Sequence, residues 1–362
     1  MTIIHAGWIE RELQASDVER VLELRRMVFP EDELDKVSPA FWGWEFRDNP
    51  AGPAIIHVGE VEGDLAAHVA VIPARWRLDG RDQTTSISVD VMTHPRHRRK
   101  RIFATLNKNT LLAAGQQGIP FTYAFDMREE ALPGALGIGF EKLMSLPVLA
   151  KPTSFRRVLR RWLKHDLLCL LGACLARPTY RLYCLGRRKP QPDREVAVHE
   201  VAEFDDRFTK FFEQACAPHE IIQVRDAEYL TWRYLRNPAR SYRILVAEKQ
   251  GALVGFAVLR CCEVLGLRAG MLVDLLCLPG QSGAAQRLLC AAEEILARDK
   301  VDLIGYLGSE DDAHWALLRG NGYLRSPYAY HFIVHVNRDD FVRETIWDSR
   351  KWFLTWGDTD VM

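Results

Sequence analysis

A run of basic residues stands just before a predicted helix in the first third of the chain. It lies in "VDVMTHPRHRRKRIFATL", residues 89–106, and its cations are Arg96, Arg98, Arg99, Lys100 and Arg101. The start of a helix offers unpaired backbone N–H groups and the positive end of the helix dipole, which together bind anions. Arginine side chains add charge-assisted hydrogen bonds to such a site. The pattern therefore predicts a phosphate site at the helix that begins near Ile102, and a solvated basic turn without a ligand is the alternative.

Three carboxylates are expected near this loop. Asp90 stands on the strand that leads into it, and Glu129 and Glu130 follow the end of the next predicted strand, "IPFTYAFDM". A carboxylate in such a place can act as a general base that takes a proton from a substrate. For Asp90 the alternative is a buried carboxylate that holds the fold together.

The cysteines and histidines do not have the spacing of a metal site. All eight cysteines lie between Cys169 and Cys290, and no C-x-x-C occurs. We therefore expect neither a structural zinc site nor a disulfide framework, and no cysteine has the sequence context of a nucleophile. An isolated histidine is more often a core or surface residue than a base. The histidines closest to the predicted site are His68, His94 and His97.

The composition is that of a globular protein. The chain has 362 residues, of which 48% are apolar and 27% charged, and its formal net charge is zero. The zero net charge gives no global field that would recruit nucleic acid, so a nucleic-acid partner is not expected. The N-terminal segment lacks the residue order of a signal peptide, and no apolar run has the length of a membrane span. These features predict a cytoplasmic protein.

The chain contains an internal repeat. The stretch "FWGWEFRDNPAGPAIIHVGEVEGDLAA", residues 41–67, is similar to "LTWRYLRNPARSYRILVAEKQGALVGF", residues 230–256, at a constant offset that pairs Trp44 with Trp232. Further on, "VDVMTHP" matches "VDLLCLP" and thereby pairs Asp90 with Asp274. A period this long indicates two similar domains and not a solenoid. An aspartate at the same position of both copies favours a structural role for Asp90.

Each copy shows the same predicted order of elements: a helix, two hairpin strands, a third strand, a helix, a strand, a helix and a final strand. We expect an α/β (α+β) fold with two duplicated domains, each a mixed, mostly antiparallel sheet flanked by helices. The expected organisation is an N-terminal domain, a basic helical linker, a C-terminal domain and a tail, at residues 1–150, 151–194, 195–345 and 346–362. Trp42, Trp44 and Trp232 are expected to fill the core.

The segment 89–106 resembles the acyl-CoA-binding motif of the GCN5-related N-acetyltransferase (GNAT) superfamily, in which a strand runs into a loop of the form Q/R-x-x-G-x-G/A and then a helix. The element order and the turns "GIGF" and "GNGY" are also similar to that family. The resemblance implies that acetyl-CoA, or another acyl-CoA, is the co-substrate. It implies that the pantetheine arm pairs with the backbone of Val91, Met92 and Thr93. The pyrophosphate would lie on the loop and helix start formed by Arg98, Arg99, Lys100, Arg101, Ile102 and Phe103.

The sequence departs from the family pattern at three points. Arg101 replaces the first glycine of the loop and Phe103 the last small residue. The tyrosine that usually acts as an acid is replaced by Ala135 in the first copy and Leu318 in the second. The second copy also has no arginine in its loop before Arg287. We therefore assign the cofactor to the first copy and expect the second to be degenerate, although tandem relatives with the opposite division of labour exist.

The resemblance implies an N-acyltransferase that moves an acyl group, most simply acetyl, to a primary amine of a small molecule or sugar precursor by direct attack. The first alternative is a catalytically decayed CoA-binding or scaffolding protein, in agreement with the missing tyrosines. A second is a transferase that uses aminoacyl-tRNA, as peptidoglycan aminoacyl transferases with paired domains of this fold do. The neutral net charge argues against a tRNA partner.

The segment between the copies is basic and apolar. Its arginines are followed by "LLCLLGACLA", which is too short to span a bilayer. Two interpretations remain for residues 156–176: a basic amphipathic helix that touches a membrane surface, or an ordinary helix packed between the domains with a solvated basic face. The second is favoured from the sequence.

Overall fold

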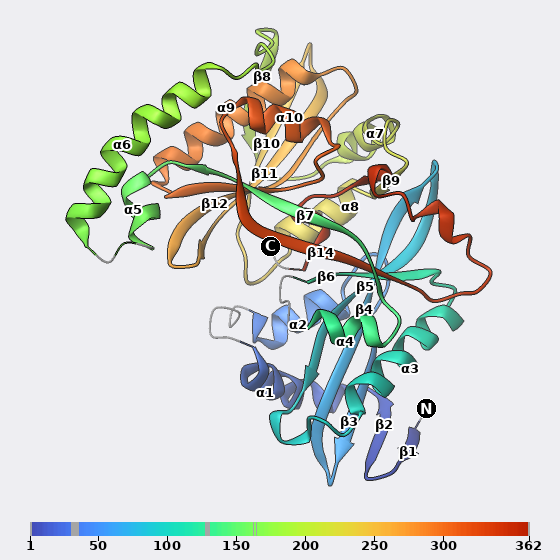
Figure 1. Cartoon of the computed structure of the whole chain (residues 1–362). Helices are drawn as coiled ribbons and strands as arrows, with labels where there is room; N and C mark the ends of the chain where they lie inside the picture. The colour runs from blue at the N-terminus through green and yellow to red at the C-terminus, as the bar shows by residue number, and fades with distance from the viewer. Residues whose placement is uncertain (1, 30–35, 127–130, 162, 164, 361–362) are drawn as a thin grey trace. The chain divides into compact units, whose positions relative to one another are not determined.

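The computed structural model describes residues 2–29, 36–126, 131–161, 163 and 165–360 (Figure 1). The chain divides into two compact units. The first comprises Met1–Ser145, Thr231–Arg240 and His331–Ser349, and the second comprises Leu146–Leu230, Ser241–Tyr330 and Arg350–Met362. Glu129 and Glu130 lie outside the described residues, so their role stays a prediction.

The first unit is built on a mixed sheet with the strand order β1-β2-β3-β4-β5-β6-β14. Neighbouring strands are antiparallel except for β5 and β6, which are parallel. The strands are β1 (Thr2–His5), β2 (Trp8–Glu12), β3 (Ile55–Val61), β4 (Asp64–Leu78), β5 (Arg81–Thr93), β6 (Phe121–Asp126) and β14 (Leu324–Val336). The helices are α1 (Val18–Val28), α2 (Pro39–Phe46), α3 (Ile102–Gln116) and α4 (Leu132–Gly137).

Helices α1 and α3 cover opposite faces of this sheet. Val58 of β3 packs with Val21 and Leu24 of α1. A Cβ atom at the next residue, Gly59, would lie 3.0 Å from Cγ2 of Ile102 in α3. Since successive residues of a strand point to opposite faces, the sheet is buried on both sides. This burial explains the long apolar runs in β4.

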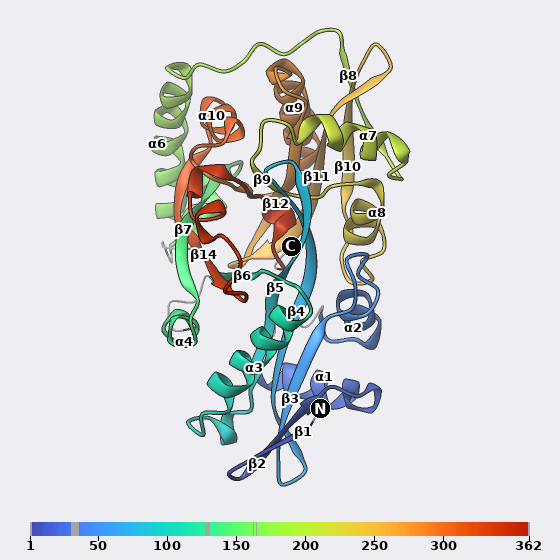
Figure 2. The same ribbon diagram turned by 90° about the vertical axis from the view of Figure 1, so that its right-hand side faces the viewer.

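The second unit repeats this plan. Its sheet has the order β7-β13-β12-β11-β10-β8, in which β12 and β13 are parallel and the other neighbours antiparallel. The strands are β7 (Glu141–Pro152), β8 (Val196–Val201), β10 (Arg243–Lys249), β11 (Ala252–Val264), β12 (Leu267–Cys277) and β13 (Leu303–Leu307). Outside this order, β9 (Ile221–Gln223) pairs in parallel with β15 (Trp352–Phe353). The helices are α5 (Phe155–Arg160), α6 (Asp166–Leu185), α7 (Asp206–Ala215), α8 (Ala227–Leu230), α9 (Ser282–Arg298) and α10 (Ala313–Gly320), and Figure 2 gives a second view of them.

The final strand of each sequence repeat belongs to the other unit. Residues 331–336 of β14 pair with β6 of the first unit, for example Phe332 with Phe125. Residues 148–152 of β7 pair with β13 of the second unit, for example Leu149 with Tyr306. The predicted boundaries at residues 150 and 195 follow the sequence repeat, whereas the compact units exchange their last strands. Alternation of apolar residues shows that a strand exists, but it does not show which sheet the strand joins.

The two tryptophans paired by the repeat contact each other inside the first unit. The indole N–H of Trp44 donates to the carbonyl of Trp232 at 2.8 Å, and the indole N–H of Trp232 donates to the carbonyl of Trp44 at 3.0 Å. Their rings stack with centroids 4.9 Å apart, and both side chains are buried. Such reciprocal contacts between equivalent residues are typical of a twofold relation. The expectation that these residues fill the core is confirmed for both.

The predicted fold class is confirmed in both units. The hairpin β1-β2 and helix α2 were not anticipated from the sequence. Helix α2 is set up locally, because Ser38 accepts a hydrogen bond from the N–H of Phe41 and Pro39 takes the first helical position. Within the described residues, no helix is long and apolar enough to cross a membrane.

Candidate functional site

Strand β5 carries a bulge at Asp90 and Val91, where the backbone segment predicted to bind the cofactor begins. Its antiparallel register with β4 pairs Val89 with Ala70 and then Met92 with His68, so the register skips Asp90 and Val91. Asp90 has a φ of +50°, which is a left-handed conformation that is strained for a residue other than glycine. A bulge of this kind turns backbone groups away from the ladder and is often found next to functional sites.

Among the described residues, the parallel ladder between β5 and β6 consists of Ser86 with Thr122 and Ile87 with Tyr123. Strand β5 continues beyond Ile87 to Thr93, which ends the segment predicted to bind pantetheine through its backbone. The hydroxyl oxygen of Thr93 is buried and has no hydrogen-bond partner among the described residues. A polar atom in this condition needs a partner from solvent or a ligand.

The loop after β5 presents its cations to solvent. Arg98, Arg99, Lys100 and Arg101 are exposed, and Arg99 and Arg101 have φ values of +66° and +60°. The resemblance placed Arg101 where the family has glycine, and the left-handed backbone is the conformation that glycine adopts most easily. Lys100 Nζ lies 3.3 Å from Nδ1 of His97. Burial and the charge of Lys100 lower the pKa of His97, so a neutral imidazole is available to accept this hydrogen bond.

Helix α3 begins directly after these cations. Its N-terminal flanking residue is Arg101, and no side chain caps the helix start. The first amide N–H groups of the helix are therefore open to an anion. The side chain of Ile102 is buried, and Phe103 packs in the core with α4. These two predicted binding residues can therefore contact a cofactor only through their backbone. The ring of Phe103 packs against α4 and does not fill the loop.

Asp90 is held in a buried ion pair. Its Oδ1 lies 2.8 Å from Nη2 of Arg25 in α1, and its backbone carbonyl lies 2.9 Å from Nδ1 of His68. Arg25 also donates to the carbonyl of Lys36 and lies 3.5 Å from Glu45. Burial lowers the pKa of His68 to about 4, so this imidazole is neutral at physiological pH. The geometry supports the structural alternative for Asp90, and a role as base stays a hypothesis.

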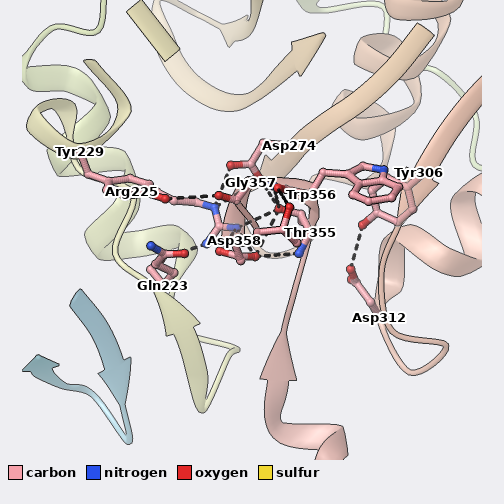
Figure 3. A network of polar contacts seen from close by, with 11 residues as sticks. Gln223, Arg225, Tyr229, Asp274, Tyr306, Asp312, Thr355, Trp356, Gly357 and Asp358 are labelled. Atoms are coloured by element: carbon pink, nitrogen blue, oxygen red, sulfur yellow. Dashed lines mark hydrogen bonds and ion pairs between the residues drawn. The ribbon is translucent and has the colours of Figure 1, made fainter. Parts of the chain in front are cut away.

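The equivalent aspartate of the second unit lies in a larger network (Figure 3). Arg225 Nε is 3.0 Å from Asp274 Oδ2, and Arg225 Nη2 is 2.9 Å from both carboxylate oxygens of Asp358. Thr355 Oγ1 lies 3.2 Å from Asp274, and Tyr229 donates to the carbonyl of Gly357 at 3.3 Å. Burial and the charge of Asp274 raise the pKa of Asp358 to about 6 against the opposing effect of Arg225. Thr355 and Asp358 thus connect the C-terminal segment to Asp274 of β12 through buried hydrogen bonds and ion pairs.

The second unit also contains a cavity of about 710 Å³ at the loop between β12 and α9. This loop is the counterpart of the basic loop of the first unit, and Gly280 in it has a φ of +78°. Cations, carboxylates and aromatic rings line the cavity. They include Arg188, Lys189, Arg350, Lys351, Glu220, Asp311, Trp352 and Phe353. The sequence predicted a weaker phosphate site here because the loop itself lacks arginine, and it gave no sign that cations from the linker and from the C-terminal region reach the same cavity.

A thiol, an imidazole and a carboxylate meet in the wall of this cavity. His314 Nδ1 lies 3.2 Å from Asp312 Oδ1, and Tyr306 donates to Asp312 Oδ2 at 3.3 Å. Burial alone would lower the pKa of His314, but the charge and hydrogen bond of Asp312, together with a hydrogen bond to Cys277, raise it to about 10. Sequence reasoning missed this grouping, because Cys277 is far along the chain from Asp312 and His314.

In both copies, the position of the tyrosine that acts as an acid in the family holds an apolar residue. Ala135 and Leu318, at the positions of the family's tyrosine, lie in the two hydrophobic cores. Among the described residues, no group of histidine, cysteine, aspartate and glutamate side chains could hold a metal ion.

Comparisons with known proteins agree with this geometry. Residues 10–129 match the family model described as an acetyltransferase (GNAT) domain. No curated protein sequence shows significant similarity to the chain.

Three solved structures illustrate the similarity of fold. Saccharomyces cerevisiae N-myristoyltransferase with bound myristoyl-CoA has a TM-score of 0.62 at 13% identity, covering 92% of this chain and 80% of that chain. A probable N-acyltransferase from Enterococcus faecalis V583 has a TM-score of 0.62 at 10% identity, covering 91% and 73%. A GCN5-related N-acetyltransferase from Anabaena variabilis has a TM-score of 0.62 at 12% identity, covering 91% and 73%. At these identities the similarity concerns the fold.

Proposed function

Because the chain is a tandem GNAT-fold protein, we propose that it is an acyl-CoA-dependent N-acyltransferase whose acyl-CoA site lies in the first unit. The observation that carries this proposal is the start of α3, which has no side-chain cap and lies beside four exposed cations in the loop after β5. The acyl group is most simply acetyl. The acceptor is a primary amine of a small molecule or sugar precursor.

The residues of the loop fit the parts of coenzyme A. The amides of Ile102 and Phe103 and the side chains of Arg98 and Arg99 would hold the phosphates. The backbone of β5 from Val91 to Thr93 would pair with the amides of the pantetheine arm, as an added strand does. The buried hydroxyl of Thr93 would gain the hydrogen-bond partner that it lacks among the described residues.

The reaction is a direct attack. The amine nitrogen attacks the thioester carbonyl carbon, the carbon–sulfur bond breaks, and coenzyme A leaves as a thiolate that takes a proton. The amine loses one proton to a base, and a backbone amide polarises the carbonyl. Since Asp90 is bound to Arg25, we place the base at Glu129 or Glu130, and Asp90 is the second choice.

The location is proposed to be cytoplasmic. All eight cysteines are free, which is typical of a reducing compartment.

The test is calorimetric binding of acetyl-CoA to the full-length protein, followed by an assay of thiol release with and without amines. Arg98→Ala combined with Arg99→Ala should weaken binding by roughly 10²-fold, because two charge-assisted contacts are lost. Arg188→Ala combined with Lys189→Ala is the matched control at the cavity of the second unit and should leave the affinity unchanged. The reverse result would assign the cofactor to the second unit.

A catalytically decayed CoA-binding protein is the second candidate. It is favoured by Arg101 at the glycine position and by the ion pair that occupies Asp90. Binding of acetyl-CoA without amine-dependent thiol release, across a panel of primary amines, would support this candidate.

A further inference from the structure

Helix α6 of the second unit presents large apolar side chains to solvent. Seven of its leucines have exposed fractions between 46% and 82%, namely Leu167, Leu168, Leu170, Leu171, Leu175, Leu182 and Leu185. In Figure 1 the helix runs along the periphery of its unit beside α5. Isolated exposed leucines are ordinary on protein surfaces, whereas a contiguous apolar face marks an interaction site. We call this set the leucine face of α6.

The side of α6 that packs against its own unit is made of small residues. Cys169 and Ala173 are the buried residues of the helix. A Cβ atom at Gly172 would lie 2.9 Å from Leu159 of α5, so α5 and α6 approach each other closely through this glycine. Tyr180 fastens the second half of the helix by donating to the carbonyl of Gly322 at 2.8 Å. A helix of a water-soluble domain normally turns its large apolar residues inward, and α6 does the opposite.

The charges around the leucine face are almost all positive. Between residues 155 and 185 the sequence contains six arginines and a single acidic residue, Asp166. Arg156 and Arg160 form exposed ion pairs with Asp166, and such pairs contribute little and are easily exchanged. Arg177 and Arg181 are exposed on α6 itself. The surface therefore combines apolar side chains with an excess of positive charge.

We propose that α5 and α6 bind the surface of an anionic lipid bilayer, with α6 in the plane of the interface and its leucine face inserted among the lipid chains. A bilayer surface of this kind offers both apolar depth and negative charge, which are the two properties that this surface complements. The helix does not qualify as a membrane span, so it lies on the membrane. The exposed leucines favour this proposal over the interpretation preferred from the sequence, an ordinary helix packed between the domains with a solvated basic face.

A second copy of the chain fits the same surface less well. In a twofold dimer the same patch faces itself, so the arginines of one copy would approach those of the other. Like charges that meet in an interface oppose association. An anionic bilayer has the opposite charge and is therefore the occupant that we choose.

The experiment is co-sedimentation of the full-length protein with vesicles of phosphatidylcholine alone and of phosphatidylcholine mixed with phosphatidylglycerol. The protein should bind the anionic vesicles at least about 10-fold more tightly than the neutral ones. The triple variant Leu167→Gln, Leu171→Gln, Leu175→Gln should lose this binding. These side chains are exposed, so the variant should keep its thermal melting temperature and its affinity for acetyl-CoA.

A matched triple variant controls for the loss of exposed apolar residues as such. Ile4→Gln, Leu136→Gln and Val342→Gln change exposed apolar residues elsewhere and should leave vesicle binding unchanged. The proposal is overturned if the parent protein stays in the supernatant with anionic vesicles or if the control loses binding equally. It is also overturned if sedimentation velocity shows a dimer that the α6 variant converts to a monomer while neither protein binds vesicles. None of these outcomes depends on acyl transfer, so failure of this proposal would not count against the proposed function.

Discussion

The two units place an aspartate at the equivalent strand position, next to an irregularity of the ladder, but they neutralise it with arginines from different places. Asp90 is paired with Arg25 of α1, and Asp274 with Arg225 from the segment before α8. At the repeat offset of 188 residues, Glu213 takes the place of Arg25 and Val37 the place of Arg225. The aspartate is kept while the source of its counter-charge changes. This difference indicates that the strand position itself requires a paired carboxylate.

The surroundings of the two pairs also differ. Besides Asp90, Arg25 donates to the carbonyl of Lys36 and lies near Glu45. Besides Asp274, Arg225 donates to Asp358 and to the hydroxyl oxygen of Thr355. In the second unit the pair therefore joins the C-terminal segment to the sheet. In the first unit it joins α1 to the sheet.

The largest effect is expected from removing Arg225. Arg225→Met leaves two buried carboxylates without their shared cation and should lower the free energy of unfolding by about 3 to 5 kcal/mol. Arg25→Met should cost less, since a single short ion pair is lost. Urea denaturation followed by circular dichroism measures both. Arg243→Met, which breaks an exposed pair with Glu200, is the control and should cost less than about 1 kcal/mol.

Substitution of the aspartates tests whether they share one role. Asp90→Asn and Asp274→Asn should each lower the free energy of unfolding by about 1 to 3 kcal/mol, because each leaves a buried arginine poorly paired. Turnover with an amine, corrected for the folded fraction, should change little in either variant. A fall of roughly 10² or more for Asp90→Asn alone, with normal stability, would instead make Asp90 the general base.

A pH-dependent difference is expected at the cavity of the second unit. The pKa of His314 is raised from 6.5 to about 10, so its contribution to stability is complete below pH 6.5 and is lost as the pH rises through 10. The stability difference between the parent and His314→Gln should therefore shrink from pH 7 to pH 9, by at most about 1.4 kcal/mol per pH unit. A stability difference that does not change between pH 7 and pH 9 would contradict a protonated His314 in the folded protein.

The smallest effect is expected at Arg101. Arg101→Gly removes a left-handed backbone strain of about 1 kcal/mol and one exposed cation, so the melting temperature should rise slightly. The affinity for acetyl-CoA should change by no more than about 1 to 2 kcal/mol, the scale of one charge-assisted contact. If the variant creates binding that the parent lacks, Arg101 blocks the phosphate site and the decayed alternative gains support.

Local patterns in the sequence predicted the elements and the loop well. The repeat, the helix after the basic run and the mostly antiparallel sheet follow from periodicity and from the chemistry of helix starts. The network around Arg225 could not be predicted in this way, because its partner Asp358 is 133 residues away in a segment without periodicity. The exposure of the leucines on α6 could not be predicted from the sequence, because an apolar pattern does not show whether a neighbouring element covers it. The cavity cations, drawn from the linker and the C-terminal region, are likewise a result of tertiary folding.

The exchanged final strands have a consequence for the order of events during synthesis. A nascent chain that has just completed the first repeat contains β1 to β7, yet β6 still lacks its partner β14, whose paired residues end at Val336. Domains usually fold one after another as the ribosome releases them. Here the sheet of the first unit closes only after Val336 has emerged, through contacts of large sequence separation that slow folding. The pairing of β6 with β14 therefore waits for the synthesis of the second repeat.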